Sequence, residues 1–132
     1  HPVAHSFPTR RSSDLLGSLE HQYWIHEIAR HCRRIYSECD VVVEHPLGEG
    51  KTADVVVLKD NKVVLAVEVE TGKSNVQNNI DKYSRINAGQ IIVAFVNQET
   101  LNAIREKLTI QDNIILTTVS KSFKLMSLNN TP

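Results

Sequence analysis

The stretch ADVVVLKDNKVVLAVEVE, residues 53–70, decides the fold that this sequence predicts. Its two halves are rich in valine, and the dipeptide Asp60-Asn61 between them is a turn signal. The second half begins with apolar residues on both faces, which indicates that it is buried. We therefore predict a β-hairpin with strands at 53–59 and 62–70.

Carboxylates open the first strand of this hairpin and end the second. Because side chains alternate along a strand, Glu68 and Glu70 point to one face, where buried like charges repel each other. A cation between them would turn this repulsion into attraction, and Asp54 can supply a third ligand. Hard oxygen ligands without cysteine favour Mg²⁺ or Mn²⁺, which activate water for attack on a phosphoryl group. The alternative is that both glutamates are solvated charges at a strand end.

The pairing of the hairpin decides whether Asp54 can join this site. With a two-residue turn and regular pairing, Asp54 faces Val67 and lies on the opposite face from Glu68. The site therefore requires an odd-length loop or a β-bulge near Asp54.

Outward from the hairpin, the chain alternates between helices and strands. We predict helices at 17–36, 74–87 and 98–108, strands at 40–45, 90–96 and 113–119, a loop at 46–50 and a weak edge strand at 121–128. Ser74 is expected to cap its helix, with Gln77 in the capping-box position. The order αβββαβαβ predicts a single α/β domain over residues 16–128, with a mixed central sheet flanked by helices.

Composition bounds the class of protein. The chain has 132 residues, and 15 Lys and Arg balance 15 Asp and Glu, which excludes a strongly basic DNA coat and an acidic tail. Cys32 and Cys39 form neither a CxxC motif nor a disulfide framework, so we expect a reducing compartment, the cytoplasm. No apolar run is long enough for a membrane span, and no membrane partner is expected.

The two ends of the chain are set apart from the fold. Residues 7–15, FPTRRSSDL, resemble the translation of a common sequencing adapter. We therefore expect residues 1–15 to be a disordered or artefactual leader, and residues 129–132 to be a frayed tail. A missing upstream domain is left open.

The order of helix, strand, Asp54, hairpin, Glu68-Val69-Glu70 and helix resembles the PD-(D/E)xK, or restriction-endonuclease-like, nuclease superfamily over residues 20–97. The segments TADVVV and AVEVETGKS are most similar to small resolvase-like and Mrr-like members. The resemblance implies a restriction-endonuclease-like αβββαβ core, extended by a further α and β element. It also implies a metal-dependent DNA endonuclease, in which a metal-activated water hydrolyses phosphodiesters at a site made by Asp54, Glu68 and Glu70.

Two positions depart from the family pattern. Ala53 replaces the proline, and Glu70 replaces the lysine. In some members the lysine lies on a nearby element, and Lys73 and Lys82 are the candidates for the catalytic role here. If neither reaches the carboxylates, Glu70 acts as a ligand or base, or the chain is an inactive member that binds nucleic acid or a partner ATPase.

The resemblance also implies ligands and contacts outside the hairpin. Asp54 and Glu68 are the expected metal ligands, with Glu27 of the first helix preferred over Glu20 as a third. The expected DNA contacts are Lys51, Lys73, Ser74, Gln77, Asn78, Lys82 and Arg85, and the alternative is an ordinary solvated surface. The expected partners are DNA, a second copy of the chain in a homodimer, and an upstream or partner ATPase.

Two Gly-Lys-Ser/Thr tripeptides and one histidine give weaker indications of function. Gly50-Lys51-Thr52 and Gly72-Lys73-Ser74 resemble the end of a Walker A loop but lack its first glycine, which argues against an NTPase. His21 falls near the apolar stripe of the first helix, and we expect it to be a hydrogen-bonded packing residue.

Overall fold

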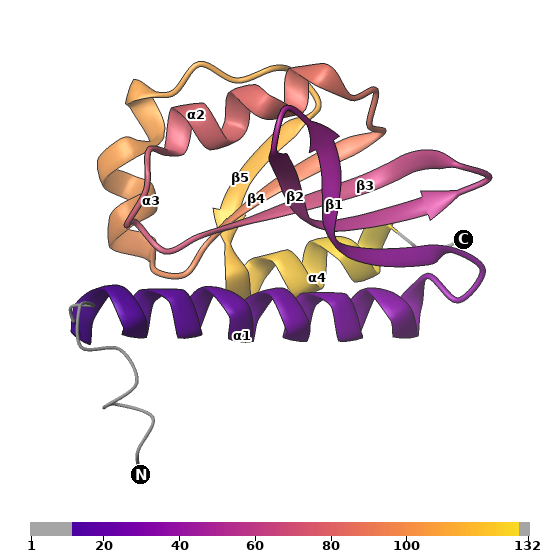
Figure 1. Cartoon of the computed structure of the whole chain (residues 1–132), viewed down its shortest axis with the longest axis horizontal. Coiled ribbons are helices and arrows are strands. Elements are labelled where there is room, and N and C mark those ends of the chain that lie inside the picture. The colour runs from indigo at the N-terminus through magenta and orange to yellow at the C-terminus, as the bar shows by residue number, and fades with distance from the viewer. Residues whose placement is uncertain (1–11, 130–132) are drawn as a thin grey trace, which may run out of the picture.

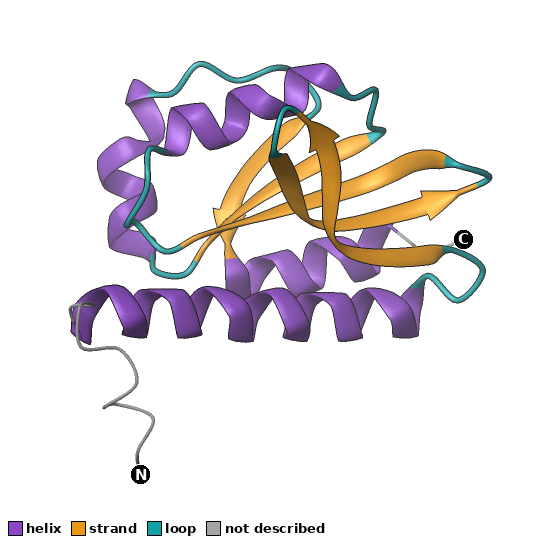
Figure 2. Cartoon of the chain, in the orientation of Figure 1, coloured by secondary structure: helices purple, strands orange, loops and turns teal. Residues whose placement is uncertain are grey.

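A five-stranded sheet lies between two layers of helices in the computed structural model of this chain, which describes residues 12–129 (Figures 1 and 2). The elements are α1 (Ser12–Ile35), β1 (Asp40–Gly48), β2 (Lys51–Lys59), β3 (Lys62–Glu70), α2 (Val76–Asp81), the 3₁₀ turn η2 (Lys82–Arg85), β4 (Gln90–Phe95), α3 (Gln98–Ile104), the 3₁₀ turn η3 (Arg105–Lys107), β5 (Ile114–Thr118) and α4 (Val119–Asn129). No helix within residues 12–129 is both long and apolar enough to cross a membrane.

The sheet is mixed, as the sequence predicts. Its strands follow the order β1-β2-β3-β4-β5, with β1, β2 and β3 antiparallel and β3, β4 and β5 parallel. This division follows from the connections, because short turns join the antiparallel strands, whereas α2 and α3 carry the chain back across the sheet between parallel ones. Strand β3 therefore lies at the centre, where its partners cover both of its edges.

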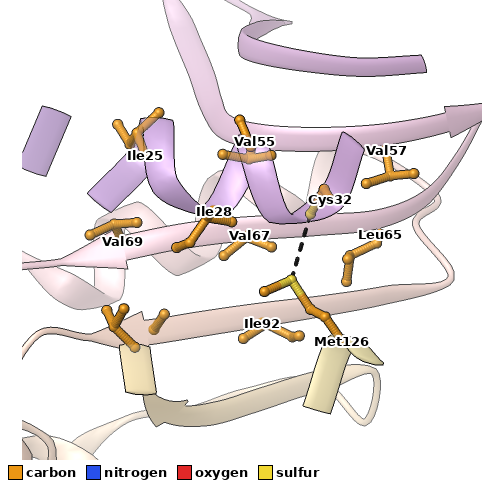
Figure 3. Packing of buried hydrophobic residues seen from close by; sticks show 13 residues of the cluster. Ile25, Ile28, Cys32, Val55, Val57, Leu65, Val67, Val69, Ile92 and Met126 are labelled. Atoms are coloured by element: carbon orange, nitrogen blue, oxygen red, sulfur yellow. Dashed lines mark hydrogen bonds between the residues drawn. The ribbon is translucent and has the colours of Figure 1, made fainter. Parts of the chain in front are cut away.

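Each face of the sheet has its own hydrophobic core. On one face, α1 and α4 lie side by side and pack on apolar residues of β2, β3 and β4 (Figure 1). Figure 3 shows Ile25 and Ile28 of α1 over these strands, and the thiol of Cys32 lies 3.6 Å from the sulfur of Met126 of α4. The opposite face is covered by α2, η2 and α3, with Tyr83 fully buried among them.

Three predicted boundaries are corrected. Helix α1 begins at Ser12, so part of the expected leader is helical; the rest, residues 1–11, lies outside the described residues, as do residues 130–132 of the expected tail. Strand β1 runs to Gly48 through Pro46, which an edge strand tolerates because one side of its backbone needs no partner. Asn129, the first residue of that tail, ends α4.

The segment 121–128 is helical and not a weak edge strand. Val119, Ser122 and Met126 are buried, and their spacing places them on one helical face against α1. The prediction was wrong because a short segment of mixed polarity has no clear period by itself. Its apolar face becomes evident only when α1 lies beside it.

The helices after β3 and β4 are shorter than predicted. Helix α2 begins at Val76 and is capped by Asn75, whose side chain accepts a hydrogen bond from the Asn78 N–H, so Ser74 is not the cap. It ends at Asp81, and the chain continues as the 3₁₀ turn η2. The last turn before β5 is likewise 3₁₀, as η3.

A β-bulge in the central hairpin provides the shift of register that the carboxylate site requires. Lys59 pairs with Lys62 across the two-residue turn, but Val57 pairs with Leu65, so Val64 is the extra residue on β3. The bulge lies beside the turn and not near Asp54, yet its effect extends along both strands. From Val55 opposite Val67, one further step places Asp54 across from Glu68 and on the same face.

The bulge also explains one glycine. A β-carbon at Gly89 would lie 2.8 Å from the carbonyl oxygen of Val64, and the Gly89 N–H donates to the neighbouring Val63 carbonyl at 3.0 Å. We expect Gly89→Ala to lower the free energy of unfolding by about 1–3 kcal/mol, because a backbone atom must move. Chemical denaturation measures this change. The exposed neighbour Asn87→Ala is the control and is expected to stay within about 0.5 kcal/mol of the unaltered chain; equal effects of both would contradict the steric argument.

Candidate functional site

The candidate site lies where β2 and β3 separate. Their pairing ends at Val55 and Val67, and Asp54 Oδ2 then accepts a hydrogen bond of 2.8 Å from the Val69 N–H. The side chain of Asp54 thereby takes the place of a backbone partner for β3. This contact holds the Asp54 carboxylate beside Glu68, although neither residue is part of a regular pair between these strands.

Glu68 is a buried carboxylate that its neighbours hold on both sides. It is only 3% exposed, and both of its oxygens have partners. Lys82 Nζ lies 3.0 Å from Oε2, and the Tyr83 hydroxyl donates to Oε1 at 2.5 Å. The two partners are consecutive residues of η2, so this single turn satisfies the whole carboxylate. A lysine thus reaches the carboxylates, and it is Lys82.

The charges around Glu68 act in opposite directions. Burial and then repulsion from Asp54 raise the pKa of Glu68, Lys82 and Tyr83 lower it, and the net result is an increase from 4.5 to about 7. Burial, together with the negative charge of Glu68, also raises the pKa of Tyr83 well above its usual range. Tyr83 is therefore a neutral hydrogen-bond donor, and Lys82 is the cation that faces Glu68.

His21 completes the site from the opposite side of the sheet. Its Nε2 lies 3.1 Å from Asp54 Oδ2, and this hydrogen bond raises the pKa of His21. From the sequence we predict that His21 is a hydrogen-bonded packing residue, but the sequence does not show that its partner is Asp54, the candidate metal ligand. The sequence did offer one indication of this contact. His21 lies next to the apolar stripe of α1, and a partly buried polar side chain needs a polar partner.

Glu70 is buried but engaged elsewhere. Its Oε1 accepts a hydrogen bond of 2.8 Å from the Asn79 amide, and its Oε2 accepts one of 3.4 Å from the Ser74 hydroxyl. The Asn79 amide also donates to Ser74 at 2.9 Å. Burial raises the pKa of Glu70. These contacts make Glu70 an anchor for the start of α2.

A pocket of about 420 Å³ opens over these groups. Its lining combines the candidate carboxylates with hydroxyl, amide and amine groups: Ser18, His21, Asp54, Glu68, Val69, Thr71, Lys73, Ser74, Asn79 and Lys82. Both candidate lysines therefore border the pocket. Lys73 is exposed on its rim, whereas the side chain of Lys82 is only 11% exposed and contacts Glu68 directly.

The structure does not bring the remaining predicted residues into this pocket. Glu27 pairs with Arg30 of the same helix at 3.5 Å, and Glu20 is exposed. The amide of Gln77 is hydrogen-bonded in both directions to the backbone of Thr109, so it fastens α2 to the segment before β5.

Arg85 and Lys51 lie near the turn between β1 and β2. The Arg85 guanidinium is 2.7 Å from the Glu49 carboxylate, which ties η2 to this turn. Lys51 is exposed at the start of β2, and Asn78 is exposed on α2. None of these three side chains lines the pocket.

The donor chemistry of the pocket fits a hard cation only in part. Within residues 12–129 no group of three His, Cys, Asp or Glu side chains is arranged to hold a metal ion. Asp54 and Glu68 nevertheless provide two adjacent carboxylates, and Mg²⁺ is usually bound by one or two carboxylates with water and substrate phosphate as its other ligands. The repulsion that raises the pKa of Glu68 is the kind of strain that a bound cation relieves.

No protein-family model, curated protein or solved structure matches this chain. What the site can do is therefore decided by its own geometry and chemistry. Two opposed carboxylates, a buried lysine and an open polar pocket are the features that any function must use.

The buried state of Glu68 makes the stability of the metal-free protein depend on pH. The folded chain binds the Glu68 proton more tightly than the unfolded chain, so this residue lowers the free energy of unfolding as pH rises from about 4.5 to about 7. Glutamine mimics the protonated acid and does not titrate. We therefore expect the free energy of unfolding of Glu68→Gln to fall by about 1–3 kcal/mol less over this pH range than that of the unaltered chain. Urea denaturation in EDTA at several pH values measures it, and identical pH profiles for the two proteins would contradict the burial argument.

Proposed function

We propose that this chain is a Mg²⁺- or Mn²⁺-dependent deoxyribonuclease that hydrolyses phosphodiester bonds, of the restriction-endonuclease-like class. The observation that carries the proposal is the position of Lys82 Nζ, 3.0 Å from Glu68 in the pocket that Asp54 also lines. A neighbouring lysine is the group that the family resemblance requires and that Glu70 fails to supply at its own position. The same observation favours this reading over an inactive member of the fold.

The side chains of the pocket divide the chemistry between them. Asp54 and Glu68 would hold the ion, which when bound supplies an activated water and stabilises charge on a phosphoryl oxygen. Lys82 donates hydrogen bonds into the same space and can orient the attacking water or the phosphate. His21 and the Val69 N–H both contact Oδ2 and keep Asp54 in place, and its other oxygen would be available to the ion.

The rim of the pocket is the proposed place for the DNA backbone. Lys73 and Ser74 line the pocket beside the carboxylates, and their amine and hydroxyl groups are typical phosphate contacts. The amide of Gln77 and the guanidinium of Arg85 already have partners within the fold, so we do not propose them as contacts. Equal numbers of basic and acidic residues predict modest non-specific affinity for DNA.

Two further partners follow from the family resemblance alone. A homodimer would allow both strands of a duplex to be cut, and an ATPase, upstream in the chain or separate, would act as a partner. The cytoplasm is the proposed compartment, because the two cysteines are free and Cys32 is buried.

A cleavage assay tests the proposal. Plasmid and four-way-junction DNA are incubated with the full chain in Mg²⁺, Mn²⁺ or EDTA, and product is followed on gels. We expect metal-dependent cutting that falls at least about 100-fold in Asp54→Asn, Glu68→Gln and Lys82→Met, because each change removes a group that acts on the scissile phosphate.

The matched control for the lysine is Lys62→Met. Lys62 is an exposed lysine at the turn end of β3, at the opposite end of that strand from the pocket, and its replacement removes the same charge. We expect this variant to cut like the unaltered chain. Absence of cutting by the folded chain on both substrates, or cutting that survives Asp54→Asn and Glu68→Gln, would overturn the proposal.

A further inference from the structure

The contact between Lys82 and Glu68 occupies the position that a metal ligand needs. Among residues 12–129, Glu68 Oε2 has one hydrogen-bond partner, the Lys82 ammonium at 3.0 Å, and the ion pair is largely shielded from solvent. A divalent ion bound by Asp54 and Glu68 would meet a positive charge at this oxygen. Lys82 therefore either prevents binding of the ion or moves when it binds.

The other oxygen of Glu68 is held differently. The Tyr83 hydroxyl donates to Oε1, so it links η2 to β3. Tyr83 is fully buried and has a rigid ring, whereas Lys82 has a flexible four-carbon stem at the edge of an open pocket. Of the two partners of Glu68, only Lys82 can leave without disturbing the core.

We propose that Lys82 is an internal cation that holds Glu68 Oε2 in the metal-free protein and is exchanged for the divalent ion, while Tyr83 keeps Oε1 in place. The proposal rests on the proposed function only in taking Asp54 and Glu68 as the ligands of the ion. In the metal-free state Lys82 offsets the repulsion between these carboxylates, which stabilises the fold. After the exchange, the Lys82 ammonium is free to turn toward a phosphate in the pocket. Binding of the ion therefore also releases Lys82 from Glu68.

Calorimetric titration of the full chain with MnCl₂, in the absence of DNA, tests the exchange. Lys82→Met removes the competing cation, and we expect its affinity for Mn²⁺ to be about tenfold higher than that of the unaltered chain, or greater. Lys82→Arg retains the charge and is expected to bind with little or no gain. Lys73→Met removes an equal charge from the rim of the same pocket without touching Glu68, and we expect a change of less than about twofold.

An unchanged or lower affinity of Lys82→Met would overturn the exchange, as would an equal gain in Lys73→Met. Because Lys82→Met leaves Glu68 without its cation and can lose stability, a second measurement uses the unaltered chain. Crystal structures with and without Mn²⁺ should show that the contact between Lys82 Nζ and Glu68 Oε2 is lost when the ion is bound. A contact that persists beside a bound ion would overturn the proposal.

The same titration separates this inference from the proposed function. Absence of Mn²⁺ binding by both the unaltered chain and Lys82→Met would overturn the metal site and the exchange together. Binding with the expected gain in Lys82→Met, but without cleavage of DNA, would support the exchange and overturn the nuclease. Cleavage and binding without that gain would support the nuclease and overturn the exchange.

Discussion

The register between β2 and β3 is the constraint on which the rest of the site depends. The extra residue at Val64 shifts the pairing by one position, so that Asp54 lies opposite Glu68 and not opposite Val67. With regular pairing, one of these carboxylates would point to the face covered by α1 and the other to the face covered by α2. The bulge lies at the turn end of the hairpin. The Val64 carbonyl fits there because Gly89 has no side chain.

Burial of Glu68 then determines what the neighbouring elements must supply. A carboxylate with so little exposure is costly unless hydrogen bonds and an opposite charge satisfy it. Two consecutive residues, Lys82 and Tyr83, do this from the 3₁₀ turn η2. The hydrogen bonds of Glu70 to Asn79 and Ser74 position the helix that leads into this turn. Glu70 thus contributes to placing Lys82 beside Glu68.

The two helical layers contribute unequally to the site. The face covered by α1 and α4 is almost wholly apolar, and α1 contributes His21, which contacts Asp54, and Ser18 to the pocket. The opposite face combines an apolar core with the buried groups of the site, because Tyr83 belongs to both. Stability and chemistry are therefore coupled on that face, because a change at Tyr83 alters the core as well as the state of Glu68.

Local patterns in the sequence were enough to predict the hairpin at 53–70 and the mixed sheet, because valine runs, turn dipeptides and alternation act over a few residues. The sequence also showed that some shift of register was needed, and it limited the candidate lysines to two. Only the tertiary structure decided where the bulge lies, that Lys82 reaches Glu68, that Glu27 stays with Arg30, and that His21 contacts Asp54. The physical reason is that the contacts of Lys82 with Glu68 and of His21 with Asp54 join residues 14 and 33 positions apart on separate elements. Their partners are set by how the helices pack on the sheet, and no local period records that packing.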